Sequence, residues 1–150
     1  MSAKNKLSLT LQFPDARLKK QLPKALLKQA VQAALLAPAE LTLRFVDAAE
    51  GKILNRDFRG KDYATNVLTF AYTEGSDAAI TLADIILCTD VLVQEAAAQN
   101  KSLQSHALHL IVHGVLHAQG YDHENEQEAE EMEALETAIL ATLAIANPYA

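Results

Sequence analysis

All five histidines of the chain lie within residues 106–123, and their spacing limits what this segment can fold into. His113 and His117 are four residues apart, so an α-helix places both imidazoles on one face, where they can reach a single cation. Gly120 can then adopt a left-handed conformation and reverse the chain, which returns His123 toward the same point. Three neutral imidazoles with a fourth position open to water characterise a catalytic zinc site. We therefore predict one Zn²⁺ per chain, bound by His113, His117 and His123.

Other interpretations of these histidines stay open. They could pack on the core or the surface of an amphipathic helix, or they could hold a structural zinc. A structural zinc usually has four protein ligands, and the chain has a single cysteine, Cys88. His109 lies one turn before the first predicted ligand, and we expect it either to support that ligand by a hydrogen bond or to pack against the core.

The spacing HxxxHxxGxxH equals that of the metzincin zinc peptidases, with one important difference. Those enzymes carry a glutamate after the first histidine, and this glutamate is their general base. Gly114 stands at that position here. We therefore expect the chain to bind zinc without having the usual means of activating water against a peptide bond.

The periodicity of apolar residues predicts an α+β fold. Alternation of apolar and polar residues is typical of half-buried strands, and apolar residues three and four apart are typical of helices. Because strands come first and helices fill the C-terminal half, one α+β domain over residues 1–150 is the expected architecture. One strand is apolar on both faces around Asp84, so we expect a central strand with an inward-facing carboxylate. The predicted strands are 7–13, 41–45, 67–72 and 80–88, and the predicted helices are 23–37, 48–58, 90–100, 103–119 and 126–146.

Capping residues mark several helix ends. Asp47 is expected to begin the second helix and Gly60 to end it. Asn125 and Glu128 resemble a capping pair for the last helix. We expect the acidic stretch 124–136 to cap and solubilise that helix rather than to bind a second metal.

Composition and charge limit the classes of function. The longest apolar run, residues 137–146, is about half of the ~20 residues that a membrane helix needs. No apolar signal-peptide block follows Met1, and one cysteine cannot form an internal disulfide, so a cytoplasmic protein without a membrane partner is expected. The net charge is −6, but residues 1–61 hold twelve Lys/Arg against five Asp/Glu. One basic face could therefore bind a partner that carries phosphate groups.

Three segments together resemble the YbeY endoribonuclease family, also called the rRNA maturation factor family. They are HLIVHGVLHAQGYDH at 109–123, LNRDFRGKDYATNVLTF at 54–70 and ADIILC at 83–88, and they occur in the family's order. The resemblance implies a small mixed sheet of about four strands flanked by helices, related to the zincins through its histidine-bearing helix. It also implies a cytosolic zinc hydrolase that cuts single-stranded RNA, not DNA, during 16S rRNA 3′-end maturation and ribosome quality control. Ribosomal proteins or a ribosome-associated GTPase are the implied partners.

The same resemblance places the family's catalytic arginine at Arg59. A planar, permanently charged guanidinium suits the charge that develops on a phosphoryl group. Arg56 and Lys61 lie beside the same turn and are candidate substrate contacts, with an ordinary solvated surface as the alternative. Asp122 is expected to orient a ligand histidine. The nucleophile stays open between water and the 2′-hydroxyl of the substrate.

Further alternatives concern RNA binding and the reaction itself. Lys20, Lys24 and Lys28 recur at helical spacing and could line an RNA path, or they could simply be a solvated helix face. A zinc hydrolase of another substrate, such as a peptide or a small ester, is one rival function. A non-catalytic ribosome-assembly factor whose zinc is structural is the other.

Overall fold

The computed structural model describes residues 5–72, 79–121 and 124–149. Within these residues, four strands form one sheet in the order β1-β2-β4-β3. The strands are β1 (Leu7–Gln12), β2 (Ala39–Val46), β3 (Val67–Ala71) and β4 (Thr81–Cys88). β1, β2 and β4 are parallel, and β3 pairs antiparallel with β4. The predicted α+β class and small mixed sheet are confirmed.

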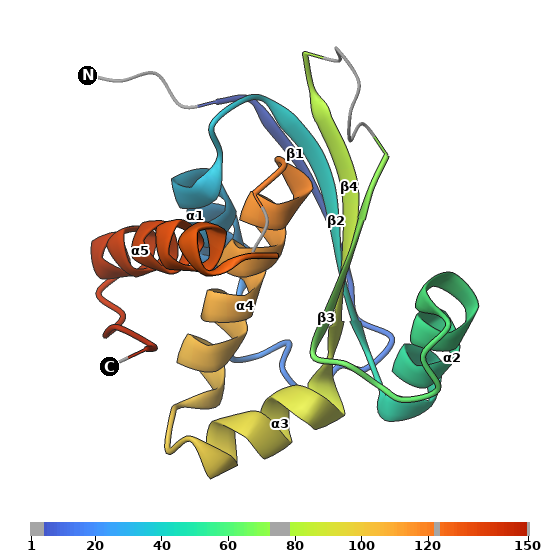
Figure 1. Cartoon of the computed structure of the whole chain (residues 1–150). Coiled ribbons are helices and arrows are strands. Elements are labelled where there is room, and N and C mark those ends of the chain that lie inside the picture. The colour runs from blue at the N-terminus through green and yellow to red at the C-terminus, as the bar shows by residue number, and fades with distance from the viewer. Residues whose placement is uncertain (1–4, 73–78, 122–123, 150) are drawn as a thin grey trace.

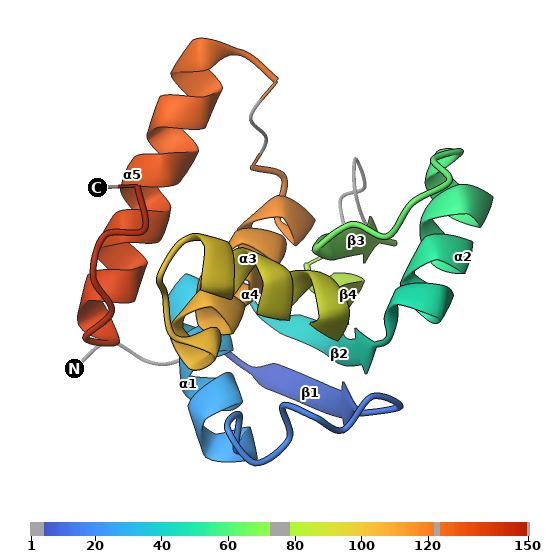
Figure 2. The same cartoon turned by 90° about the horizontal axis from the view of Figure 1, so that it is seen from below.

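The helices cover the two faces of the sheet unequally. They are α1 (Lys24–Ala34), α2 (Ala48–Arg59), α3 (Thr89–Ala98), α4 (Leu103–Ala118) and α5 (Glu126–Thr142). α1, α4 and α5 lie on one face, and α2 lies on the other (Figure 1). Seen from below, α4 lies between the sheet and α5, which explains why most of its residues are buried (Figure 2). None of the described helices is long and apolar enough to cross a membrane.

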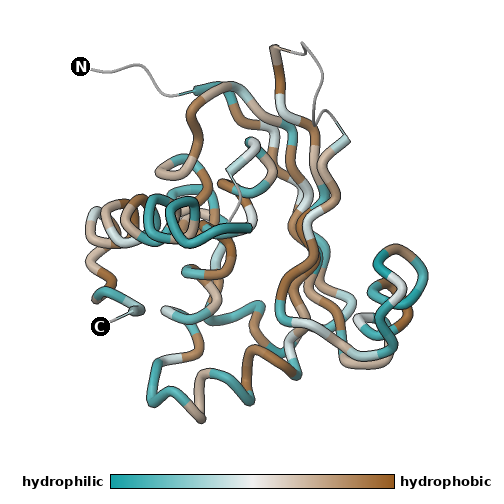
Figure 3. The backbone as a smooth tube through the Cα atoms, viewed as in Figure 1, coloured by the Kyte–Doolittle hydropathy of each residue, from teal (hydrophilic) through white to brown (hydrophobic). Residues whose placement is uncertain are grey.

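Alternation along the strands builds two apolar layers. Leu41, Leu43 and Phe45 of β2 are buried toward α1 and α4, in the main core. Ile86 and Cys88 of β4 face the opposite way and pack in a smaller cluster against α2. The middle of the sheet is accordingly brown in Figure 3, whereas the first turns of α5 are teal. The period-2 pattern of the sequence therefore indicated the buried face of β2 correctly.

The predicted caps are present at the helix ends. The Asp47 side chain accepts a backbone hydrogen bond of 2.9 Å at the start of α2, and Gly60 ends that helix with a φ of 70°. The Asn125 side chain accepts a backbone hydrogen bond of 2.8 Å at the start of α5. Gly120 has a φ of 102° directly after α4, so the chain turns there as the sequence predicts.

Three local predictions are wrong. The first helix ends at Ala34 rather than at 37, because Leu35 is already extended. The last helix ends at Thr142 rather than at 146, because Ala144 adopts a left-handed φ of 60°. Leu143 and Ile145 still pack against the core after the turn, which made the apolar period look continuous. Asp84 does not face inward: it points away from α4 and accepts a 2.6 Å hydrogen bond from the exposed Tyr72 hydroxyl.

Candidate active site

A groove of about 720 Å³ runs between α4 and the segment that leads from the end of α2 into β3. One wall comes from α4 and from the chain after α5, and the other from residues 55–69. The lining residues are His109, Leu110, His113, His117 and Tyr149 on the first wall, and Asn55, Arg59, Lys61, Tyr63, Thr65, Asn66, Val67, Leu68 and Thr69 on the second. The fold thus brings together two segments that the sequence singled out separately.

Two predicted metal ligands lie on the α4 wall. The rings of His113 and His117 are nearly parallel, at 6°, with centroids 6.4 Å apart. The Tyr121 carbonyl oxygen accepts a hydrogen bond from His117 Nδ1 at 3.0 Å, and Glu136 Oε1 accepts one from His113 Nδ1 at 3.2 Å. Both acceptors lack hydrogens, so each ring donates through Nδ1–H.

This arrangement fits a pair of zinc ligands. Metal-binding histidines typically donate one ring N–H to a carboxylate or a backbone carbonyl and bind the metal through the other nitrogen. The third predicted ligand, His123, and the predicted orienting acid, Asp122, lie outside the described residues. Among the residues that the structure describes, no group of three His, Cys, Asp or Glu side chains forms a metal-binding cluster.

Gly114 lies where α4 packs tightly against the sheet. A Cβ atom there would be 2.9 Å from Ile85 Cγ2 on β4 and 3.4 Å from Thr69 Oγ1 on β3. A side chain at this position would therefore start inside the packed layer between α4 and the sheet. The packing gives a physical reason for the absence of the metzincin glutamate.

Arg59 reaches the groove from the end of α2. The left-handed turn at Gly60 directs the chain back toward the sheet, and the Arg59 guanidinium donates a 3.3 Å hydrogen bond to the carbonyl oxygen of Thr69 on β3. Thr69 also neighbours Gly114. Arg59 and the part of α4 next to His113 therefore both lie beside Thr69.

The other two basic candidates differ in placement. Lys61 lines the groove, whereas Arg56 is exposed, contacts Asp57 at 3.3 Å and is not among the described lining residues. The turn that carries Lys61 is held by Asn55, which is buried and donates a 2.7 Å hydrogen bond to the carbonyl oxygen of Tyr63. This role of Asn55 was not predicted from the sequence.

Glu136 is a site residue that the sequence did not predict. Its side chain on α5 is 1% exposed, and its Oε1 accepts hydrogen bonds from His109 Nε2 at 2.9 Å and from His113 Nδ1 at 3.2 Å. Burial alone raises the pKa of this carboxyl, but the bonds from the two histidines outweigh it and lower the pKa to about 2. Glu136 is therefore an ionised carboxylate inside the protein.

The expectation that the acids of 124–136 only cap and solubilise the helix is thus wrong for Glu136. A signal was present, because Glu136 lies one turn after Met132 and three residues before Ile139, both buried. An acid on the buried stripe of an amphipathic helix requires a partner in the core. The sequence could not show that the partners are His109 and His113 of another helix.

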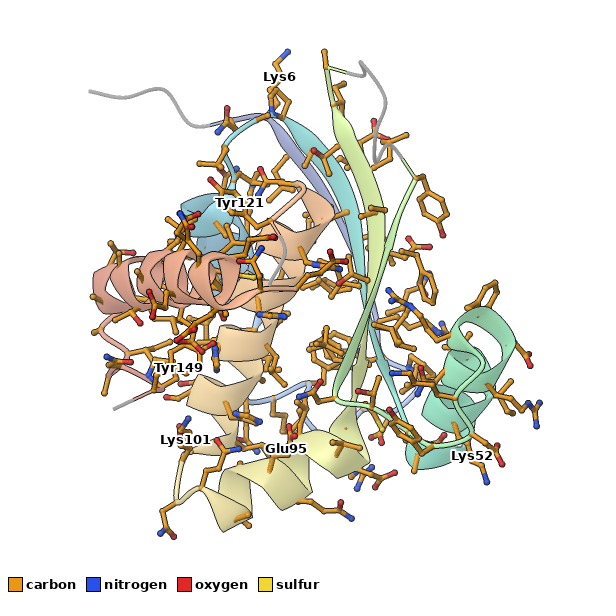
Figure 4. The ribbon with its side chains drawn as sticks, in the orientation of Figure 1. Lys6, Lys52, Glu95, Lys101, Tyr121 and Tyr149 are labelled. Carbon is orange, nitrogen blue, oxygen red and sulfur yellow. The ribbon has the colours of Figure 1, made fainter. Side chains whose placement is uncertain are left out.

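Tyr149 completes this cluster from the chain after α5. Its hydroxyl lies 3.1 Å from Glu136 Oε1 and 3.2 Å from Oε2, and also 3.1 Å from His109 Nε2. Burial and the neighbouring carboxylate raise the pKa of Tyr149. Figure 4 shows Tyr149 on the side of α4 that faces α5. His109, which we predicted as a support for the ligands or as a packing residue, is thus joined to His113 through Glu136.

The fifth histidine, His106, and the three lysines predicted at helical spacing lie elsewhere. His106 contacts Glu95 of α3 at 3.0 Å, and the Asn66 amide contacts the same carboxylate at 3.1 Å, which ties α3, α4 and the start of β3 together. Lys24 and Lys28 lie on α1, which packs against α4 and β1. Neither of these lysines is a described lining residue of the groove, and neither is Lys20.

Comparisons with known proteins agree with the fold. The family model described as Endoribonuclease YbeY matches residues 4–144. The Endoribonuclease YbeY of Janthinobacterium sp. (strain Marseille) is 68% identical over 99% of this chain and 98% of its own length. That of Herminiimonas arsenicoxydans is 66% identical over 97% and 96%. The solution structure of TM1509 from Thermotoga maritima is similar with a TM-score of 0.57 and 25% identity, covering 92% of this chain and 91% of that one.

The fold and the groove are those of a small α+β hydrolase with a histidine-bearing helix. The chain belongs to the YbeY endoribonuclease family, because the family model and relatives above 60% identity both cover nearly all of it. The resemblance stated from the sequence is confirmed, and so is the prediction that the chain is an enzyme of the endoribonuclease class.

Proposed function

We propose that this protein is a zinc-dependent endoribonuclease that cuts single-stranded RNA. The observation that carries the proposal is the groove, in which Arg59 and Lys61 on one wall face His113 and His117 on the other. Phosphodiester cleavage needs cationic groups for the phosphoryl oxygens and a means of activating a nucleophile, and the two walls offer these separately.

The zinc would be held by His113, His117 and His123. When bound, zinc polarises a phosphoryl oxygen and lowers the pKa of bound water to about 7. The chain itself contributes the orientation of the ligands. The hydrogen bonds from Nδ1 of both described histidines orient the rings, and Nε2 would be the coordinating nitrogen.

Arg59 supplies the permanent charge. Its 3.3 Å hydrogen bond to the Thr69 carbonyl uses one guanidinium nitrogen and aims the group into the groove, and the remaining N–H donors can bind phosphoryl oxygens. Lys61 adds a second cation on the same wall, suited to a neighbouring phosphate of the strand. Removal of one such donor typically lowers kcat by about 10²–10³-fold.

The substrate that we propose is 16S rRNA, at its 3′ end, with cleavage also serving ribosome quality control in the cytoplasm. Family membership and the basic segment at 56–61 support this assignment. Ribosomal proteins or a ribosome-associated GTPase would then bring the enzyme to its target. Incubation with 30S particles that carry precursor 16S rRNA should yield the mature 3′ end, and failure to do so with active enzyme would refute this part.

The direct test is cleavage of a labelled single-stranded RNA by zinc-loaded protein, beside identically purified His117→Ala. We expect cleavage by the wild type only. Equal cleavage by both would reveal a contaminating nuclease, and no cleavage by either would favour a non-catalytic assembly factor. Because Gly114 leaves no general base beside the first ligand, a substrate with one 2′-deoxy residue at the cut site should then identify the nucleophile. Loss of cleavage would indicate the 2′-hydroxyl, and retained cleavage would indicate water.

A further inference from the structure

The cluster around Glu136 links the groove to a segment far from it in the sequence. Glu136 of α5 accepts hydrogen bonds from His113 on one side and from the Tyr149 hydroxyl on the other. His113 lines the groove directly, whereas the Glu136 side chain is 1% exposed and not a described lining residue. Glu136 therefore contacts the groove through side chains that line it, and among these His113 is the predicted metal ligand.

The chain after α5 is held in place so that Tyr149 meets this carboxylate. Lys101 Nζ donates a 2.9 Å hydrogen bond to the Pro148 carbonyl oxygen, and the Asn147 side chain accepts one of 2.8 Å from the Tyr149 backbone N–H. The Tyr149 ring also packs edge-on against His109, with centroids 5.3 Å apart at 89°. Tyr149 is thus fixed from three directions.

Packing of α5 against the core does not require a carboxyl group at position 136. A carboxyl group on a buried stripe has a large desolvation cost, and an apolar residue beside Met132 and Ile139 would avoid it. The tyrosine hydroxyl lies within hydrogen-bond distance of both carboxylate oxygens, which restrains the rotation of the Glu136 side chain. Glu136 Oε1 consequently stays directed at His113 Nδ1.

We propose that Glu136 and Tyr149 are positioning residues of the metal centre, and that the segment 147–149 is therefore a functional part of the enzyme. Glu136 holds the proton of His113 on Nδ1 and the orientation of its ring, and Tyr149 holds Glu136. This inference rests on the proposed function, because it assumes that His113 binds the metal. Carboxylates in this position raise the basicity of a ligand histidine, and their loss typically weakens metal binding by about 10–100-fold.

The test measures zinc affinity rather than activity. Purified metal-free wild type, Glu136→Gln and Tyr149→Phe would each compete for zinc with a chromophoric chelator, and the Co²⁺-substituted proteins would report ligand geometry by visible absorption. We expect zinc affinity to fall by about 10–100-fold in Glu136→Gln. A smaller loss is expected in Tyr149→Phe, which removes one hydroxyl and leaves the carboxylate in place.

The chain offers a matched control for each variant. Glu95→Gln changes a carboxylate of α3 that contacts His106, which lies on α4 like His113. Tyr72→Phe removes the hydrogen bond between the Tyr72 hydroxyl and Asp84 on the opposite face of the sheet. Both controls should bind zinc as the wild type does. Circular dichroism and thermal unfolding of the metal-free proteins would show which variants are folded, and Tyr149→Phe decides the question if Glu136→Gln does not fold.

Three results would overturn the inference, and they are distinguishable. Wild-type zinc affinity in folded Glu136→Gln and Tyr149→Phe would refute the positioning role and leave the proposed function intact. A wild-type protein that binds no zinc would refute the metal centre of the proposed function, and the positioning role with it. An equal loss of affinity in the Glu95→Gln control would also refute it, because the effect would then not depend on contact with His113.

Discussion

Substitution of Gly114 by alanine tests how closely α4 must approach the sheet. The added Cβ would lie 2.9 Å from Ile85 Cγ2 and 3.4 Å from Thr69 Oγ1. Ile85 is a fully buried residue of β4, the strand between β2 and β3, and Cγ2 is bonded directly to its Cβ. That methyl group cannot move aside by rotation about a distant bond, so either α4 or the strand must shift.

The expected loss of stability follows from two opposing terms. Replacement of glycine by alanine within a helix favours folding by about 0.5–1 kcal/mol. An extra methyl group in a well-packed core costs about 1–3 kcal/mol. Because the contact of Gly114 is with a rigid neighbour, we expect the second term to prevail and Gly114→Ala to lower the free energy of unfolding by about 1–2 kcal/mol.

Urea denaturation of the metal-free protein would measure this change. Gly51→Ala is a matched control, because it makes the same substitution inside α2, where the nearest atom is Cys88 Sγ at 3.3 Å. The control should lose less stability than Gly114→Ala, because its shortest contact is 0.4 Å longer. If Gly114→Ala is as stable as the wild type, the claim that packing against the sheet excludes a side chain at this position is refuted.

Three further substitutions test other parts of the structure. Asp90 accepts hydrogen bonds from Arg17 and from a backbone N–H, and these bonds lower the pKa of its carboxyl group from 3.8. Asp90→Asn should therefore lower the free energy of unfolding above pH 5 by about 1 kcal/mol, a value that allows for solvent screening. This difference from the wild type should shrink as the pH falls below about 4, and a pH-independent difference would contradict the assignment. Asn55→Ala should cost about 1–3 kcal/mol and reduce RNA cleavage at unchanged zinc affinity, because the 2.7 Å bond to Tyr63 holds the groove wall. Ala144→Gly should raise the melting temperature, because the left-handed φ of 60° strains alanine by about 0.5–1 kcal/mol and does not strain glycine. An unchanged or lower melting temperature would count against strain at this turn.

Features that depend on local sequence were predictable. The helical stripe of His113 and His117 follows from 3.6-residue periodicity, and the turn at Gly120 follows from its conformational freedom. Alternation in the strands predicted which residues face the core. Each of these features is determined by residues within a few positions of one another.

Features that depend on packing between distant segments were not predictable. The contact between Glu136 and His113 joins two helices. Glu136 is one of many acidic residues in its segment, so the sequence did not indicate that it contacts a histidine of another helix. Asp84 sits in an apolar strand, yet the sequence could not show that its face of the sheet is only partly covered. The difference between Lys61 in the groove and Arg56 outside it arises from the direction of the chain after Gly60.

The central claim is that Arg59 and the histidine wall act together on one substrate, and Arg59→Met tests it most directly. Arg44→Met is a matched control, because Arg44 contacts Glu50 at 2.7 Å and is not a described lining residue of the groove. Zinc content and the single-turnover rate of RNA cleavage would be measured on the same preparations. We predict that Arg59→Met binds one zinc, folds as the wild type does and cuts RNA about 10²–10³-fold more slowly, while Arg44→Met cuts at the wild-type rate. Cleavage by Arg59→Met at the wild-type rate would contradict the claim.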